Sequence, residues 1–295
     1  MIQNKSIPER IFDMFNMVFL LVIMIITLYP LIYVVIASFS SPSAIYQSKG
    51  LLLYPLNPTL EGYELVFRNR SILSGYTNTV FYMAVGTPIN LVLTSLGAYV
   101  LSRKKLKWSK LFMMMIVITM YFSGGLIPLF LIVRGLGLIG KFWAVILPGA
   151  ISTWNLIVMR TAFQAIPDSL EESAKIDGAH DFIILFKIII PLSLPILAVM
   201  GLFYGVGHWN AWFYAVVFLR NRAMYPLQLI LRELLIMNVE RESFKLVTTS
   251  ELQAVEMMQL LKYAVIVVAT VPILFVYPFL QKYFVKGVMI GSLKG

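Results

Sequence analysis

Long apolar runs alternate along the chain with short stretches of charged residues, glycine and proline. Several runs reach about 20 residues, the length at which a helix crosses a hydrocarbon core of about 30 Å. Their positions predict six membrane-spanning helices in one membrane domain covering residues 1–295, and hence an all-α integral membrane protein. The predicted spans lie at about 14–38, 76–101, 111–133, 142–163, 188–218 and 257–281.

The first run follows Lys5 and Arg10, as the apolar core of a signal peptide would. It is too long for such a core, and no clear small-x-small cleavage site follows it before Pro42. We therefore expect an uncleaved first span.

Basic residues indicate the orientation of the spans. Residues 102–110 form a short loop with five lysines and arginines and no acidic residue. Such loops stay in the cytoplasm, so both termini and the loop 164–187 are expected there. Segments 39–75 and 219–256 would then lie outside. We expect the first to be extended and rich in turns, and the second to be partly helical. Ser250 and Gln253 have the spacing of a capping box that would lead into the last span.

The composition excludes a water-soluble protein with a single core. The chain is 59% hydrophobic and 13% charged, with a mean hydropathy of +0.83, whereas soluble domains carry about 25% charged residues. It has no cysteine and two histidines, so metal chemistry is not expected. The net charge of +10 comes largely from short loops, a pattern typical of membrane proteins and not of nucleic-acid binding.

The predicted spans contain no aspartate or glutamate, and His208 is their clearest ionisable residue. A proton-coupled carrier normally keeps carboxylates inside the membrane as relay groups. Their absence disfavours a self-sufficient secondary carrier, which stays as the alternative, and suggests that energy enters from outside the bilayer. An intramembrane enzyme is disfavoured too, because its usual nucleophile, metal or paired-aspartate motifs are missing.

Residues 135–141 match both the G-x-G-x-x-G and the G-x-x-x-x-G-K nucleotide patterns. Phe142 stands where a P-loop needs a hydroxyl for magnesium, and no strand precedes the glycines. We therefore expect a tight external turn here and no ATP binding by this chain.

The loop 164–187 has legible local chemistry. Ser169 and Glu172 have the spacing of a capping box, and Gly178 can end a helix in the left-handed conformation. Glu171 and Lys175 form an i,i+4 pair. These features predict a helix of about two turns, redirected at Gly178 into a second segment that begins near Asp181. By spacing alone, an ordinary surface helix is the favoured interpretation.

The residue types in this loop closely resemble the Glu-Ala-Ala loop of binding-protein-dependent ABC transporter permeases. The matching positions are Glu172-Ser173-Ala174, Gly178 and Pro191. Ser173 replaces the first alanine of the family, and Ile190 stands where leucine is usual. Segments 177–179 and 191–195 further resemble the carbohydrate-uptake branch, which includes the maltose permeases.

The resemblance covers essentially the whole chain. It includes Asn78-Thr79, the segment 209–212 and the tail 281–295. Segment 123–128 is similar to permeases of polysaccharide and lipoprotein-type systems of Gram-positive bacteria.

The resemblance implies a type I ABC importer permease, a non-catalytic subunit that moves a sugar or oligosaccharide across the bacterial cytoplasmic membrane by alternating access. The implied partners are a related permease subunit in a heterodimer, two cytoplasmic ATPase subunits and an extracytoplasmic sugar-binding protein. The ATPases would bind ATP and Mg, and this chain would bind neither cofactor nor metal. Its short helix would dock in a groove on an ATPase. The residues implied in coupling are Glu171, Glu172, Ser173, Ala174, Asp177 and Gly178.

Some polar, aromatic and glycine residues of the spans are candidates for the substrate path, because aromatic faces cover sugar C–H surfaces while amides and imidazoles bind hydroxyls. They are Asn78, Gly124, Gly125, Asn155, His208, Trp209, Asn210 and Trp212. Interfacial anchoring of the aromatic residues and hydrogen bonding between helices are the competing interpretations. We also expect segment 123–128 to kink the third span.

Overall fold

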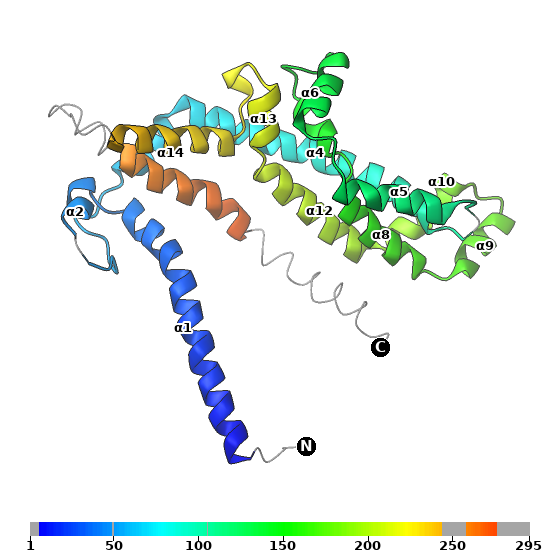
Figure 1. Cartoon of the computed structure of the whole chain (residues 1–295), viewed down its shortest axis with the longest axis horizontal. Helices are drawn as coiled ribbons and strands as arrows, with labels where there is room; N and C mark the ends of the chain where they lie inside the picture. Colours follow the sequence, from blue (N-terminus) through cyan, green and yellow to red (C-terminus); the bar gives the residue numbers. More distant parts are fainter. Residues whose placement is uncertain (1–5, 49, 105, 244–257, 276–295) are drawn as a thin grey trace. The chain divides into compact units, whose positions relative to one another are not determined.

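The computed structural model describes residues 6–48, 50–104, 106–243 and 258–275 (Figure 1). These residues form helices, apart from connecting segments and an isolated antiparallel bridge between Ser40 and Pro58. The longer helices are α1 (Ile7–Ser38), α4 (Arg70–Ser102), α5 (Ser109–Tyr121), α6 (Leu126–Gly135), α8 (Thr153–Gln164), α9 (Asp168–Ile176), α12 (Leu194–Trp209) and α14 (Leu227–Ser243). The shorter pieces are α2 (Pro42–Gln47), α3 (Glu61–Arg68), α7 (Trp143–Ile146), η1 (Leu147–Gly149), α10 (Asp181–Ile184), η2 (Leu185–Ile189), α11 (Ile190–Leu192), α13 (Phe213–Phe218) and η3 (Arg222–Met224). A further helix covers Met258–Phe275.

The chain divides into two compact units. One comprises residues 1–69 and 233–270, and the other comprises residues 70–232 and 271–295.

In the first unit, hydrogen bonds join α1 to the segment that follows it. The hydroxyls of Ser38 and Tyr63 lie 2.7 Å apart, and the Leu52 N–H donates to the Tyr29 hydroxyl at 3.1 Å. Helix α1 begins at Ile7 and not near residue 14, because the Ser6 N–H, at its N-terminus, donates to the Glu9 carboxylate at 2.8 Å.

Segment 39–75, which we expected to be extended and rich in turns, is partly helical. It contains α2, α3 and the start of α4. Pro42 is the first residue of α2, a position where its missing N–H breaks no helical hydrogen bond. Glu61 and Glu64 lie in the first turn of α3, where the helix dipole favours negative charge.

Helix α4 is the centre of the second unit. It begins at Arg70 and not near residue 76, and it continues unbroken to Ser102. Helices α8 and α12 pack along it (Figure 1). The buried residues of α4 include polar ones, among them Thr79, Asn90 and Thr94.

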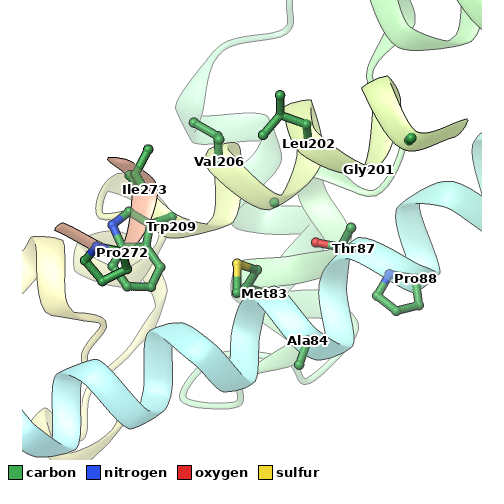
Figure 2. Close-up of a pocket in the computed structure, with 12 residues that line it drawn as sticks. Met83, Ala84, Thr87, Pro88, Gly201, Leu202, Val206, Trp209, Pro272 and Ile273 are labelled. Carbon is green, nitrogen blue, oxygen red and sulfur yellow. The ribbon is translucent and has the colours of Figure 1, made fainter. Parts of the chain in front are cut away.

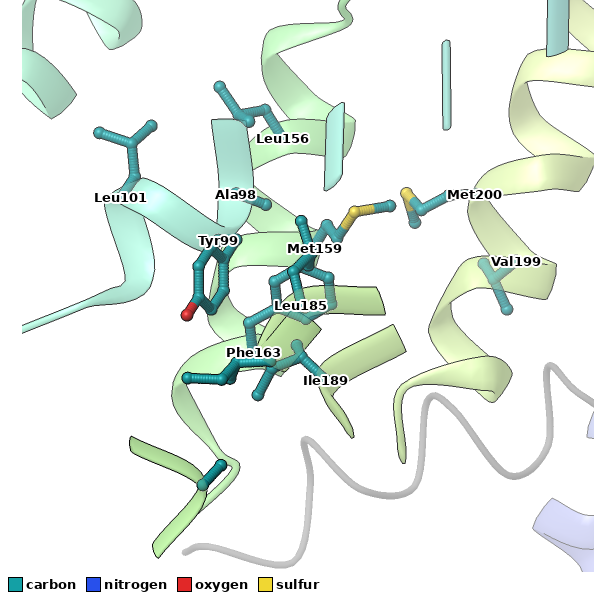
Figure 3. Packing of buried hydrophobic residues seen from close by; sticks show 12 residues of the cluster. Ala98, Tyr99, Leu101, Leu156, Met159, Phe163, Leu185, Ile189, Val199 and Met200 are labelled. Carbon is teal, nitrogen blue, oxygen red and sulfur yellow. The ribbon is translucent and has the colours of Figure 1, made fainter. Parts of the chain in front are cut away.

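Buried apolar side chains of α4, α8 and the segment 184–200 form a cluster (Figure 3). Met159, Phe163 and Met200 are completely buried in it, and Leu185 and Ile189 are 1% exposed. Ala174 of α9 belongs to the same cluster, so apolar contacts with this cluster hold the short helix α9 in place.

Three apolar runs in the second unit are bent. Helices α5 and α6 meet at 113°, the pieces 143–149 and 153–164 at 53°, and the pieces 181–192 and 194–209 at 87°. The first bend lies within residues 122–125, in agreement with the kink expected from segment 123–128. Three described helices are each long and apolar enough to cross a membrane, and up to six spans result if each bent pair is one span.

The span predicted at 188–218 is not one continuous helix in the structure. This stretch includes the end of η2, α11, α12 and α13, with breaks at Ser193 and at residues 210–212. Pro191 and Pro195 lack the N–H that a continuous helix would use, so the chain turns between them. The span predicted at 142–163 is likewise interrupted, at residues 150–152.

Two other local predictions can be compared with the structure. In the expected turn at 135–141, Gly137 and Gly140 have φ of 66° and 79°. Helix α14 agrees with the partly helical character expected of segment 219–256, whereas Ser250 and Gln253 lie outside the described residues.

Gly86 is required by a close helix contact. A Cβ atom there would lie 2.4 Å from Nε2 of His208 on α12. We predict that Gly86→Ala lowers the free energy of unfolding by about 1–3 kcal/mol, as overpacking does. Gly207→Ala, on the same α12, is the matched control, because its Cβ would meet nothing within 4 Å. Thermal unfolding of the purified protein in detergent measures both, and equal stabilities would contradict the contact.

Candidate functional site

Helix α9 is a short charged helix with defined ends. It starts at Asp168, and Pro167 occupies the N-cap position. The predicted capping box at Ser169 is therefore wrong, because Ser169 already lies inside the helix. At the other end, Gly178 has φ of 82°, a conformation that glycine adopts without strain. The Gly178 N–H donates to the Lys175 carbonyl at 3.1 Å, and the Ala179 N–H donates to the Ala174 carbonyl at 2.9 Å. This is a Schellman end, and it confirms the predicted role of Gly178 in ending the helix.

The two faces of α9 differ in burial. Ala174 is 9% exposed and packs into the apolar cluster, whereas Ile176 is 86% exposed. Glu172, Ser173 and Leu170 are exposed as well. An apolar and acidic surface is thus presented away from the helical core.

Charged side chains link α9 to the end of α4. Arg103 Nη1 donates to Glu171 Oε2, and Lys104 Nζ lies 2.6 Å from Asp168 Oδ2. Lys175 Nζ lies 2.8 Å from Glu171 Oε1, which confirms the i,i+4 pair. It also lies 3.2 Å from Asp181. A cavity of about 390 Å³ opens among these side chains.

The Glu171 carboxyl is held in its charged form. Burial alone raises its pKa, but hydrogen bonds from Lys175 and Arg103 outweigh this effect and hold the pKa below its usual value. The hydrogen bond to Glu171 raises the pKa of Lys175. The charged contacts of Glu171 with Arg103 and Lys175 therefore stabilise the folded chain at neutral pH. This contribution is lost as pH falls through the lowered pKa of Glu171.

Further along the second unit, polar residues of α4 bind backbone groups where other helices break. Asn90 Nδ2 donates to the carbonyls of Gly149 and Ala150, at 3.1 and 2.7 Å, between η1 and α8. The Tyr204 hydroxyl lies 2.6 Å from Thr94 Oγ1 and accepts from the Ser152 N–H at 3.0 Å. These contacts satisfy the backbone of an interrupted apolar run.

The same arrangement recurs near the start of α4. Asn78 Nδ2 donates to the carbonyls of Ala223 and Tyr225 at 2.7 and 3.0 Å. The Leu227 N–H, the first of α14, donates to Thr79 Oγ1 at 2.8 Å. Asn78, which we expected in the substrate path, thus bonds to the loop around η3.

Trp209 lines an apolar cavity of about 580 Å³ between α4 and α12 (Figure 2). Met83 and Thr87 of α4 border it, as do Gly201 and Gly205 of α12. The Trp209 ring is 4% exposed and meets the Tyr76 ring edge-on, with centroids 5.5 Å apart.

The structure places the other path candidates apart from this cavity. His208 Nε2 lies 2.6 Å from Asn90 Oδ1, and the Trp212 ring lies 3.6 Å from the Arg232 guanidinium. Asn210 is exposed at the end of α12, and Asn155 is 5% exposed in the first turn of α8. Gly124 and Gly125 lie in the break before α6, where Gly125 has φ of 81°.

The sequence alone indicated no hydrogen-bonding role for Tyr204 or Thr79 and no partner for Arg103. Polar residues recur in steps of four or eight along α4, at 78, 82, 90 and 94, and this spacing marks a polar face of that helix, but the series does not include Thr79, Tyr204 or Arg103. Among the described residues, no group of three His, Cys, Asp or Glu side chains is placed to hold a metal ion.

A bundle of bent apolar helices with a short charged helix packed at one end is the architecture of a transporter membrane subunit. A crystal structure of a bacterial ABC transporter involved in the import of the acidic polysaccharide alginate contains a chain of this fold. The TM-score is 0.85 with 34% identity, over 95% of this chain and 99% of that one.

The polygalacturonan/rhamnogalacturonan transport system permease protein YtcP of Bacillus subtilis is 44% identical over 97% of this chain and 99% of its own length. Protein LplC of the same organism is 40% identical over 97% of this chain and 96% of its own length. No family model matches the chain. These relatives show that the chain belongs to the family of ABC transport system permeases, and it is therefore an integral membrane protein.

Proposed function

We propose that this permease carries a sugar or oligosaccharide inward by alternating access, driven by ATP hydrolysis in a separate protein. The observation that carries the proposal is α9, a short helix packed on the core through Ala174 with Glu172 and Ile176 exposed. The names of the relatives support a carbohydrate substrate, because they include permeases for polygalacturonan/rhamnogalacturonan and for arabinooligosaccharides.

In this proposal α9 is the coupling helix. Its exposed face would sit in a groove of a cytoplasmic ATPase, with Glu172 near the contact and Ser173 beside it. Asp177 and Gly178 would turn the chain back toward the membrane. ATP and Mg would be bound by two ATPase subunits, and this chain would be non-catalytic.

The complete assembly would contain a second, related permease in a heterodimer and an extracytoplasmic sugar-binding protein. The six predicted spans would correspond to the three long helices and the three bent pairs. Both termini would be cytoplasmic. The ion-coupled carrier considered from the sequence has less support, because the relatives belong to ABC systems.

The substrate path is proposed to pass near Trp209, the one path candidate that borders the large cavity in the described part of the chain. That cavity is lined mainly by apolar side chains. Aromatic and aliphatic surfaces of this kind suit the C–H faces of a sugar ring. Asn210 is exposed next to Trp209 and could supply a hydrogen bond to a hydroxyl group.

The coupling role of α9 is tested by charge reversal at its exposed face. We predict that Glu172→Arg leaves membrane insertion intact, but lowers both ATPase co-purification and sugar uptake at least about tenfold, the scale on which a contact residue acts. Glu61→Arg is the matched control, a reversal in the first turn of α3 on the opposite predicted side. Normal co-purification with Glu172→Arg would remove α9 from the contact.

The orientation is tested with single cysteines, since the chain has none of its own. An impermeant thiol reagent added to spheroplasts should label Ser43→Cys and spare Ser109→Cys, because the basic loop 102–110 is held inside. Permeabilised cells provide the control, in which both positions become accessible. The reverse pattern in intact spheroplasts would overturn the orientation.

A further inference from the structure

Arg103 follows the last residue of α4, and its guanidinium binds three segments at once. Nη1 donates to the Glu171 carboxylate on α9, Nη2 donates to the Phe163 carbonyl at the end of α8 at 3.2 Å, and Nε donates to the Ser102 hydroxyl at 2.9 Å. The guanidinium carbon lies 4.9 Å from the centre of the Tyr99 ring.

Burial separates Arg103 from its neighbours in the basic loop. The side chains of Arg103 and Glu171 are 15% and 13% exposed, whereas that of Lys104 is 84% exposed. Orienting the loop requires only positive charge, which an exposed lysine supplies. Burying a guanidinium is costly unless it is paired and hydrogen-bonded, as Arg103 is here, so orientation alone does not explain its burial. Only arginine offers a planar fork that can reach the three acceptors.

The second observation is the route by which α9 connects to the membrane helices. Through the chain, α9 leads to α12 across Gly178, the π-helical turn η2 and the 87° bend before Leu194. That connection contains several breaks. Helix α4, in contrast, runs without a break from Arg70 to Ser102, and α8 and α12 pack along it.

We propose that Arg103 is a positioning residue for energy coupling, which clamps α9 to the end of α4 so that the two move as one rigid piece. The inference rests on the proposed function, because it assumes that an ATPase displaces α9. Displacement of α9 would then reach α4 directly, in addition to passing through the bent connection to α12. Glu171 faces the clamp, and the exposed Glu172 remains for the ATPase.

A double-mutant cycle tests whether Arg103 and Glu171 act together. We expect Arg103→Lys and Glu171→Gln each to retain ATPase co-purification and to lower sugar transported per ATP hydrolysed at least about tenfold, since lysine lacks the fork that reaches three acceptors and glutamine lacks the charge that pairs with the guanidinium. The double variant should be no worse than the worse single variant. Lys104→Met is the matched control and should stay near wild type, because its partner contact is exposed.

The outcomes separate this proposal from the proposed function. Additive losses, or a normal transport-to-hydrolysis ratio in the single variants, would overturn the clamp while leaving the permease assignment intact. Loss of ATPase co-purification in Glu171→Gln would also overturn it, because Glu171 would then be an ATPase contact. Normal co-purification with Glu172→Arg would instead contradict the proposed function, because it would remove α9 from the ATPase contact.

Cross-linking tests whether α9 and the end of α4 move together, and this test does not depend on the stability of Arg103→Lys or Glu171→Gln. Lys104→Cys and Asp168→Cys, at positions whose charged atoms lie 2.6 Å apart, can be joined by a short bis-thiol reagent. If α9 and α4 move together, the cross-linked transporter keeps its activity, and the same cross-link restores transport in Arg103→Lys. Loss of transport on cross-linking the otherwise wild-type chain would overturn the proposal.

Discussion

Backbone groups inside a bilayer have no water to bind, and each one left without a partner costs several kcal/mol. The second unit contains three bent apolar runs and so exposes such groups at each break. Helix α4 supplies partners at the break before α8 and at the start of α14. Asn90 binds the carbonyls before α8, and Thr79 binds the first N–H of α14. The polar face of one unbroken helix therefore binds backbone groups where a neighbouring run is interrupted and where α14 begins.

The same helix connects this network to the charged end of the unit. Its end carries Arg103, which binds Glu171 on α9, while its middle borders the cavity at Trp209. Gly86 lets α12 approach closely enough for His208 to reach Asn90. An importer has to link an event at its cytoplasmic face to a change near its substrate path. In this chain, helix α4 contacts both the proposed coupling helix α9 and the proposed substrate path at Trp209.

Local features were accessible from the sequence, and distant pairings were not. Gly178, the Glu171–Lys175 pair and the kink at segment 123–128 each depend on residues close in the chain, and the structure bears them out. Hydropathy could not locate the breaks within 188–218, because the residues on both sides of each break are apolar. Arg103 and Glu171 are 68 residues apart, so their pairing follows only from the packed helices. The fold class and the family were both predictable, because hydropathy and a long motif carry them.

Hydrogen exchange at two amides most directly tests the backbone bonds made by the polar face of α4 and by Tyr204 of α12, which is bound to Thr94 of α4. Thr79→Val and Tyr204→Phe keep side-chain shape, and each removes the hydroxyl oxygen that accepts from one backbone N–H, Leu227 in the first case and Ser152 in the second. The account predicts faster exchange at Leu227 alone in Thr79→Val, and at Ser152 alone in Tyr204→Phe, with the amides of α4 protected as in the wild type. Unchanged exchange at both amides would contradict it.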